Sequence, residues 1–242
     1  MKEVRYFYAP AALTTNELPS EEAAHASKVL RLQPGDEVVL IDGKGSFHQA
    51  EIVNITKSRC EYQITHSQEY PKTWNNNIHL AIAPTKNIDR IEWLTEKITE
   101  IGFDELSFLN CRFSERRVVK NERLERIIVS AVKQSRKSWM PQLTEMVSFK
   151  EFISMPHKGL KFIAHCYDQF PKIDLCSTLN KEEIKENVLI LVGPEGDFSV
   201  DEVELALKNG FQSISLGENR LRTETAGFVA VTIAQFALRK NK

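Results

Sequence analysis

Two polar loops in the C-terminal part of the chain hold the residue types best suited to binding a small molecule. Gly193–Ser199, with the sequence Gly-Pro-Glu-Gly-Asp-Phe-Ser, follows the apolar run 188–192 and precedes a helix start. Its two glycines let main chain approach a ligand closely, and Pro194 stiffens the turn. The loop has neither the Gly-Lys-Ser/Thr of a phosphate-binding loop nor the Gly-x-Gly-x-x-Gly of a dinucleotide site. Glu195 and Asp197 make it acidic, which favours a cationic ligand, although such a turn taken alone is more often structural.

The second loop, residues 216–226, also follows a short strand and precedes a helix. Residues 220–225 place two arginines, a glutamate and two threonines within six positions, which is more polar chemistry than a simple connection needs. Thr223 is expected to cap the helix that follows, so part of this pattern is structural.

A strongly basic segment lies upstream of these loops. Arg112–Lys137 contains nine basic and three acidic residues, whereas the whole chain has a net charge of -1. Positive charge concentrated on a nearly neutral protein indicates a surface that binds a polyanion. A solvated helix face explains such a run equally well. Lys133–Arg136, at its end, is a third candidate for a functional cluster.

The elements around the two loops alternate between strands and helices. We expect strands at 78–83, 106–109, 160–164, 188–192 and 213–216, and helices at 89–101, 122–137, 199–210 and 225–238. This alternation predicts a mainly parallel sheet with helices on both faces, an α/β fold. In such sheets ligands bind at the carboxyl ends of the strands, which is where both loops begin.

The first part of the chain follows a different pattern. Val38–Ile41 and the apolar stretch after Phe47 flank Asp42–Gly45, a strong signal for a β-hairpin. A short helix with Ser20 as its cap is expected before the hairpin. The polar segment 71–77 is the best linker, so we expect two domains, residues 1–72 and 77–242.

Composition excludes several classes of protein. With 42% hydrophobic and 27% charged residues, the 242-residue chain is globular and neither disordered nor collagenous. Its four cysteines and six histidines lack the spacing of metal ligands, so no metal is expected. The start, Met1–Arg5, has no apolar leader, and no apolar run is long enough to span a membrane. We therefore expect a cytoplasmic protein with reduced cysteines and no membrane partner.

Together and in this order, the polar segments resemble those of the trefoil-knotted (SPOUT-class) RNA methyltransferases. Most closely, the chain resembles the bacterial 16S ribosomal RNA (uracil-N3)-methyltransferase family. The two loops, at Gly193–Gly196 and Leu216–Thr225, are similar to that family's cofactor-loop motifs. The similarity covers nearly the whole chain and extends to Glu96–Gly102, Phe113–Arg116, Gln134 with Arg136, and, near the front, Arg5–Phe7, His25 and Val29–Asp36.

The chain departs from the family pattern in three places. Asp197 stands where a second glycine is usual, and Asn219-Arg220 replaces a commoner Pro-Arg pair. The Gln134–Arg136 spacing is one residue short, so Arg136 or Lys137 holds the family's arginine position.

The resemblance implies a fold, a cofactor and partners. The C-terminal domain is expected to form a deep trefoil knot, a topology that proteins almost never adopt, and the N-terminal domain a small PUA-like β-barrel that binds RNA. The implied cofactor is S-adenosylmethionine, and the implied partners are 16S ribosomal RNA of the small ribosomal subunit and a second copy of the chain in a homodimer. The residues implied to bind the cofactor, mostly through main chain, are Leu191, Val192, Gly193, Glu195, Gly196, Leu216, Gly217, Leu221, Arg222 and Thr223. Those implied to bind RNA are Arg5, Arg31, Arg112, Arg116, Arg123, Arg126, Gln134 and Arg136.

The implied reaction assigns catalytic roles to three residues. N3 of uridine carries a proton and is a poor nucleophile until that proton is lost. An arginine beside a neighbouring carbonyl oxygen would stabilise the developing charge, and a carboxylate would accept the proton. Arg222 and Arg116 are the electrostatic candidates, and Glu224 is the candidate base. A salt bridge to one of those arginines explains Glu224 equally well.

Two further alternatives remain open at the level of sequence. A non-catalytic ribosomal RNA-binding or assembly protein with the same fold is the alternative function, whereas the missing dinucleotide motif disfavours an oxidoreductase. Tyr6, Phe7 and Tyr8 offer stacking surface for flipped-out bases, but core packing of the small domain explains them better.

Overall fold

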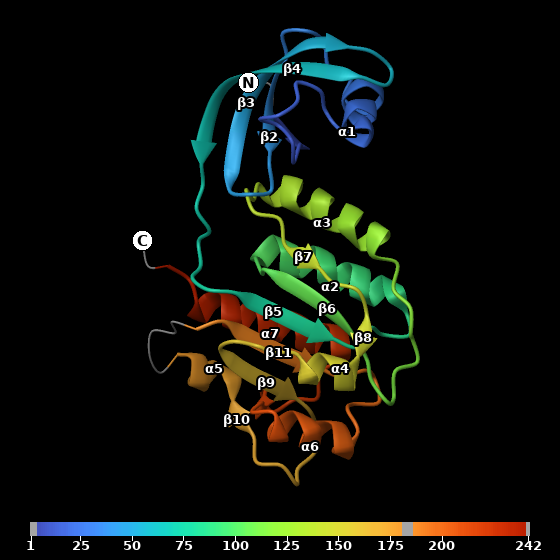
Figure 1. The fold of residues 1–242 in the computed structure, drawn as a ribbon, viewed down its shortest axis with the longest axis vertical. Helices are drawn as coiled ribbons and strands as arrows, with labels where there is room; N and C mark the ends of the chain where they lie inside the picture. Colours follow the sequence, from blue (N-terminus) through green and yellow to red (C-terminus); the bar gives the residue numbers. More distant parts are fainter. Residues whose placement is uncertain (1–3, 181–185, 241–242) are drawn as a thin grey trace. The chain divides into compact units, whose positions relative to one another are not determined.

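The computed structural model describes residues 4–180 and 186–240, and these form two compact units (Figure 1). One unit contains the residues up to Lys72 together with Val129–Met140, and the other contains Thr73–Ile128 and the chain from Pro141 onward. The sequence assigned 129–140 to the C-terminal domain, but these residues make their contacts with the first unit. Lys133 Nζ lies 2.7 Å from Glu22 Oε1, and both Ser138 Oγ and Trp139 Nε1 donate to the carbonyl oxygen of Tyr70.

The first unit is built on a four-stranded sheet in the order β1-β2-β3-β4. β1 lies parallel to β2, and the other neighbours are antiparallel. The small strand-rich domain expected here is therefore confirmed, as is the hairpin at Asp42–Gly45. The strands are β1 (Arg5–Tyr8), β2 (Glu37–Ile41), β3 (Ser46–Ile55) and β4 (Cys60–Glu69).

A short helix and an apolar core complete the first unit. The helix α1 (Ser20–Ala24) continues into a π-helical turn, His25–Val29. Ser20 was expected to cap α1, but it is the first helical residue, and Pro19 holds the cap position without a side-chain hydrogen bond. Phe7 is fully buried, so core packing is the correct interpretation for this aromatic residue.

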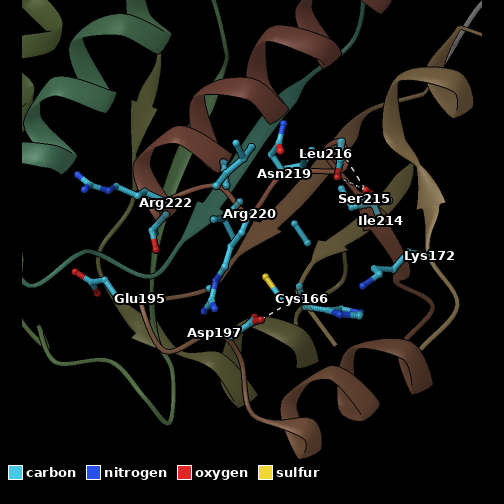
Figure 2. Close-up of a pocket in the computed structure, with 18 of the residues that line it drawn as sticks. Cys166, Lys172, Glu195, Asp197, Ile214, Ser215, Leu216, Asn219, Arg220 and Arg222 are labelled. Carbon is cyan, nitrogen blue, oxygen red and sulfur yellow. Dashed lines mark hydrogen bonds between the residues drawn. The ribbon is translucent and has the colours of Figure 1, made fainter. Parts of the chain in front are cut away.

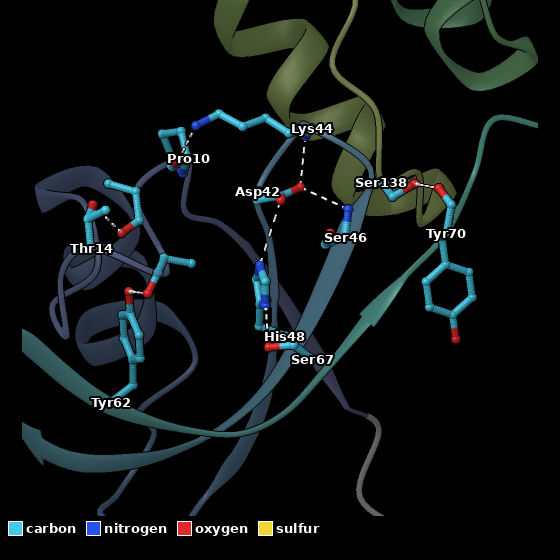
Figure 3. A network of polar contacts seen from close by, with 12 residues as sticks. Pro10, Thr14, Asp42, Lys44, Ser46, His48, Tyr62, Ser67, Tyr70 and Ser138 are labelled. Atoms are coloured by element: carbon cyan, nitrogen blue, oxygen red, sulfur yellow. Dashed lines mark hydrogen bonds and ion pairs between the residues drawn. The ribbon is translucent and has the colours of Figure 1, made fainter.

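A polar network fastens the hairpin of the first unit (Figure 3). Asp42 Oδ1 accepts hydrogen bonds from the main-chain nitrogens of Lys44 and Ser46, at 2.8 and 3.0 Å. Its Oδ2 lies 3.7 Å from Nε2 of the buried His48, whose Nδ1 is 2.8 Å from Ser67 Oγ. Because buried polar groups are costly unless paired, this chain of contacts fixes the register of β2, β3 and β4.

The second unit contains a sheet in which every pairing is parallel. Its order is β10-β12-β9-β11-β5-β6-β7, and β8 also pairs with β6. This confirms the predicted α/β class with a mainly parallel sheet, whereas the knotted chain path stays a prediction. The strands are β5 (Ile78–Ile82), β6 (Glu105–Asn110), β7 (Gln142–Leu143), β8 (Val147–Ser148), β9 (Leu160–Ala164), β10 (Ile173–Asp174), β11 (Val188–Val192) and β12 (Gln212–Ser215).

Helices cover both faces of this sheet, as predicted (Figure 1). Side chains from α2, α5 and α7 share one core with Leu80 and Ile190, while α4 and α6 share the other with Ala81 and Leu191. The alternation within β5 and β11 follows from the two-residue period of a strand. The helices are α2 (Ile88–Ile101), α3 (Asn121–Ser135), α4 (Phe149–Ser154), α5 (Leu175–Leu179), α6 (Val200–Lys208) and α7 (Thr223–Ala237).

One glycine of the second unit sits where no side chain fits. Gly159, just before β9, has a φ of +95°, and a Cβ there would overlap main-chain atoms of Asn187. The next residue, Leu160, donates from its nitrogen to Asn187 O, and this hydrogen bond aligns β9 with β11. We expect Gly159→Ala to lower the free energy of unfolding by about 2–4 kcal/mol, the combined cost of a left-handed alanine and overpacking.

Denaturant unfolding with Gly210→Ala as the matched control checks this expectation. Gly210 has a φ of +82°, but its added Cβ would meet only the flexible end of Lys161, at 3.4 Å. The free energy of unfolding of Gly210→Ala should therefore fall only by the cost of a left-handed alanine, about 1–2 kcal/mol. Equal losses in the two variants would contradict the role given to the Asn187 contact.

Candidate functional site

A cavity of about 530 Å³ lies at the carboxyl ends of β9, β11 and β12 (Figure 2). The two loops singled out from the sequence line it together, the first through Val192–Asp197 and the second through Ile214–Thr223. A third wall comes from residues 164–172, which follow β9, and Arg90 of α2 completes the lining. This is the edge of a parallel sheet at which ligands bind, and the volume is typical of small-molecule sites.

The first loop is held in shape by its own main chain and by Asp197. An added Cβ on Gly193 would lie 3.0 Å from the Phe198 nitrogen, so a side chain there requires the neighbouring main chain to shift. Asp197 has a φ of +68°, a conformation that favours glycine, which the resembling family usually has here. Its Oδ1 accepts from Phe198 N and its Oδ2 from Cys166 N, both at 2.8 Å. The carboxylate thus compensates for the strained backbone by tying the loop to the end of β9.

Glu195 and Arg116 both act on the segment that follows β5. Glu195 Oε1 accepts from Lys86 N at 2.8 Å. Arg116 donates from Nε to Thr85 O at 3.1 Å and from Nη2 to Lys86 O at 2.6 Å. Glu195 lines the cavity, but Arg116 is not among its lining residues. Both side chains therefore hold the segment Thr85–Lys86 beside the cavity. Glu195 accepts a hydrogen bond from its main chain, and Arg116 donates hydrogen bonds to it.

The second loop presents main chain and arginines to the cavity. Gly217 has a φ of +119°, and no other described atom lies within 4 Å of the position its Cβ would take. Ser215 Oγ bonds both the nitrogen and the carbonyl oxygen of Gly217, at 3.2 and 2.9 Å. Arg222, and not the expected Thr223, holds the N-cap position of α7, without a side-chain cap bond. Arg222 and Thr223 both line the cavity, Arg222 as an exposed residue and Thr223 as a buried one.

Glu224 lies behind the cavity wall. Its Oε1 is 3.7 Å from Nε of Arg90, its side chain is only 10% exposed, and it is not among the lining residues. Its Oε2 is buried with no hydrogen-bond partner among the described residues. The sequence offered a salt bridge to Arg222 or Arg116 as an alternative for Glu224. The ion pair exists, but its arginine is Arg90, which sequence reasoning missed.

Other lining residues missed from the sequence come from the loop after β9 and the tip of the second loop. In Figure 2 the side chains of Cys166, Lys172 and Arg220 point into the space that the loops enclose. Lys172 Nζ donates to Tyr167 O at 3.0 Å, and burial raises the pKa of the Cys166 thiol. The signal available in the sequence was the polar stretch directly after the strand 160–164, at the same sheet edge as the other two loops.

The residues expected to bind RNA are exposed or half-buried but are distributed over both units. Arg5, Arg31, Gln134 and Arg136 belong to the first unit, and Arg112, Arg116, Arg123 and Arg126 to the second. Arg112 and Arg123 form ion pairs: Arg112 Nη1 lies 3.2 Å from Asp201 Oδ2, and Arg123 Nε lies 2.6 Å from Glu92 Oε1. Arg136 lies over the ring of Tyr6 at 5.3 Å. Such exposed contacts are weak and leave these groups able to exchange partners.

The described ranges, 4–180 and 186–240, contain no cluster of three or more His, Cys, Asp or Glu side chains suited to a metal ion. They also contain no helix with the length and apolar character needed to cross a membrane.

Family models match both parts of the chain. The model of an RNA methyltransferase domain matches residues 72–235, and that of an RNA methyltransferase PUA domain matches residues 18–65. These matches cover the cavity and the first unit's hairpin, respectively.

Individual relatives and solved structures agree with the family models. A ribosomal RNA small subunit methyltransferase E of Buchnera aphidicola is 30% identical over 230 residues, 90% of this chain and 86% of that protein. A probable rRNA-methyltransferase of Porphyromonas gingivalis is 42% identical, with a TM-score of 0.89 over 97% of this chain and 98% of that one. The small subunit methyltransferase E of Neisseria gonorrhoeae, solved bound to S-adenosyl methionine, is 28% identical, with a TM-score of 0.82 and the same coverage. The chain therefore belongs to the RNA methyltransferase family that includes the ribosomal RNA small subunit methyltransferases E.

Proposed function

We propose that the protein methylates N3 of a uridine in 16S ribosomal RNA of the small ribosomal subunit, with S-adenosylmethionine as methyl donor. The observation that carries the proposal is the meeting of the two glycine-bearing loops in one cavity at the carboxyl edge of the parallel sheet. The methyltransferase E relatives support the ribosomal substrate, and the Neisseria gonorrhoeae structure supports the cofactor.

The residues around the cavity fit such a cofactor. A side chain on Gly193 would press on neighbouring main chain, and the space beside the Gly217 Cα is open, so both loops let a ligand come close to main chain. Glu195 and Asp197 on the cavity wall complement a positive charge. The residues proposed to hold the cofactor are those implied by the resemblance, Leu191, Val192, Gly193, Glu195, Gly196, Leu216, Gly217, Leu221, Arg222 and Thr223. When bound, S-adenosylmethionine supplies an electrophilic methyl group on a sulfonium with a good leaving group.

The chain's own residues must orient the base and favour loss of its proton. Loss of the N3 proton leaves negative charge shared with the neighbouring carbonyl oxygens, and the N3 electron pair then forms the new bond to carbon. We assign stabilisation of this charge to Arg222, because this exposed arginine is one of the residues that line the cavity. Arg116 is proposed to act from the adjacent segment. Glu224 stays the proposed proton acceptor, although its buried position behind Arg90 suits the salt-bridge alternative better.

RNA is proposed to bind through the basic side chains of both units. To hold a flipped-out uridine, the protein must also bind the flanking phosphates, which arginines can do.

We also propose a cytoplasmic homodimer. Residues 225–238 of the C-terminal helix region contain no charged residue, and Phe236 is 61% exposed there. A helix that is apolar on its outer side is typical of a subunit interface, and the mass of the protein in solution tests this.

Methyl transfer to small subunits from a strain lacking this protein tests the proposal. The wild-type protein with S-adenosylmethionine should restore one N3-methyluridine, located by mapping the ribosomal RNA. Arg222→Ala and Glu224→Ala are each expected to slow transfer by at least about tenfold while the cofactor still binds. Near-wild-type turnover in both variants would refute the catalytic assignment. A protein without affinity for S-adenosylmethionine would instead be the non-catalytic assembly factor.

A further inference from the structure

Arg90 is the one residue of α2 that reaches the cavity lining among the described residues. It lies in the first turn of the helix, three positions after the Asn87 cap, whose side chain accepts from Asp89 N at 3.1 Å. The side chain is 38% exposed, so its guanidinium is open to a ligand in the cavity. The cavity loops are separated from α2 by more than seventy positions in sequence, so the fold alone brings Arg90 to them.

The ion-pair partner of Arg90 is a buried carboxylate, that of Glu224. Glu224 is nine-tenths buried and forms an ion pair with Arg90, at 3.7 Å from Nε to Oε1. A buried carboxylate is costly unless it is paired, and its second oxygen, Oε2, has no partner among the described residues. Glu224 lies in the first turn of α7, a fifteen-residue helix, where the partial positive charge of the helix favours an anion. The site thus keeps a buried negative charge, that of Glu224, paired with Arg90, a residue that lines the cavity.

This arrangement differs from that of the other arginines at the cavity. Arg220 and Arg222 come from the loop itself, and both are exposed. Arg90 instead projects from a helix and forms an ion pair with a buried carboxylate, at 3.7 Å from its Nε, which biases the orientation of the guanidinium and leaves its N–H groups for a ligand. Donors whose direction is fixed before the reaction stabilise developing charge most effectively, because they do not reorganise when the charge appears.

We propose that Arg90 is a further catalytic residue, which donates to a carbonyl oxygen beside N3 of the target uridine. In this proposal Glu224 is the positioning residue that aims Arg90, and this role replaces that of proton acceptor. The inference rests on the proposed function. When the N3–H bond breaks, the proton leaves to water and the negative charge is shared between N3 and the two carbonyl oxygens. Arg90 stabilises that anion. The N3 pair then forms the N–CH3 bond, while the sulfur–carbon bond of the donor breaks and its electrons stay on sulfur, leaving a neutral thioether.

Single-turnover methyl transfer as a function of pH, with calorimetry of S-adenosylmethionine binding, tests the assignment. Arg90→Met should slow transfer by about 10²–10³-fold, the loss typical of removing one oxyanion donor. Its affinity for S-adenosylmethionine should stay within about threefold of the wild type. The pH at which the rate rises should move upward by about one unit, because the uridine anion loses its stabilising charge. A residue with a merely structural role would not move this profile.

Glu224→Gln separates positioning from proton transfer. The amide keeps the shape and the contact to Arg90 but loses the charge, so the rate should fall about tenfold with the pH profile moved in the same direction as in Arg90→Met. A general base would instead cost about 10²–10⁴-fold. That larger loss, with the rising limb of the profile gone, would overturn the positioning role.

Lys208→Met is the matched control, since it removes a cation paired with Glu204 on α6, outside the cavity lining. It should transfer at the wild-type rate. Arg90→Met with a wild-type rate and profile overturns the inference, and so does a loss of cofactor affinity equal to the loss of rate. If Arg90→Met does not melt as the wild type does, Arg90→Gln is judged by the same criteria. An inactive wild-type protein would refute the proposed function itself, which keeps the two failures distinct.

Discussion

The free energy of unfolding should fall by about 2 kcal/mol between pH 7 and pH 5 because of one buried imidazole, that of His79. His79 lies on β5, where its Nε2 is 2.8 Å from Ser107 Oγ and its Nδ1 is 3.6 Å from Glu105 Oε2. Burial, with a smaller contribution from the charge of His157, lowers the pKa of His79 from 6.5 to about 3. Between about pH 3 and pH 6.5 the folded protein therefore keeps this ring neutral, whereas the histidine of the unfolded chain is protonated.

The direction of the effect follows from the protons bound in each state. Below pH 6.5 the unfolded chain binds one proton more than the folded protein, so stability decreases as the pH falls. The contribution is complete above pH 6.5 and is lost progressively toward pH 3, with a total of about 4 kcal/mol by pH 3.5. Burial raises the pKa of Glu105, so that carboxyl group titrates in the opposite sense and offsets part of the loss.

Denaturant unfolding of His79→Gln at pH 7 and pH 5 isolates this contribution. Glutamine keeps a hydrogen bond to Ser107 but does not titrate, so its stability should change with pH by about 2 kcal/mol less than that of the wild type. His66→Gln, a change at the exposed His66 of β4, should leave the pH dependence as it is. Parallel stability curves for His79→Gln and the wild type would show that His79 is not the group responsible.

Local signals made the two cavity loops predictable from the sequence. Each loop follows an apolar strand and precedes a helix start, and the helix after the first loop begins with a capping box of Ser199 and Glu202. The hairpin at Asp42–Gly45 and the end of α2 at Gly102 likewise depend on residues close together in the chain. Glycine conformation, caps and strand alternation are short-range properties, so a single sequence carries them.

The third wall of the cavity, residues 164–172, could not be predicted from local sequence patterns. Residues 164–172 reach the cavity because β9 lies between β11 and β12 in the sheet. No periodicity in a single sequence specifies which strands are neighbours. Arg90 was missed for the same reason, since a basic residue in the first turn of an amphipathic helix has the pattern of a solvated side chain. Its meeting with Glu224 exists only once α2 and α7 are packed together.

The division of α3 between two units was also invisible in the sequence. Its apolar residues Leu124, Ile128, Ala131 and Val132 follow one uninterrupted helical period. This period predicts that one face of the helix is buried, but it does not indicate which part of the chain covers that face. Leu124 joins the core of the second unit, whereas Lys133, two turns later, pairs with Glu22 of the first. A domain boundary drawn from composition therefore assigned the whole helix to one side.

Replacing Gly193 should weaken binding of S-adenosylmethionine more than it weakens the fold. An added Cβ would lie 3.0 Å from Phe198 N and 3.1 Å from the carbonyl carbon of Asp197. These are main-chain atoms, and the hydrogen bonds from Phe198 N and Cys166 N to the Asp197 carboxylate hold them in place. The loop must move as a whole to admit a side chain, which changes the main chain that faces the cavity.

Calorimetry of S-adenosylmethionine binding measures the consequence. Overpacking costs about 1–3 kcal/mol, so affinity should fall by about 5- to 150-fold, at the low end for Gly193→Ala and at the high end for Gly193→Val. Gly227→Ala is the matched control: its Cβ would come equally close, 3.1 Å, but to the side-chain ends of Ile82 and Leu94, outside the cavity lining. Those side chains can adjust, and alanine favours the helix, so the control should bind the cofactor as the wild type does. Full affinity in Gly193→Val would mean that this turn does not shape the cofactor site, and the proposed binding mode would then have to rest on the loop around Gly217 alone.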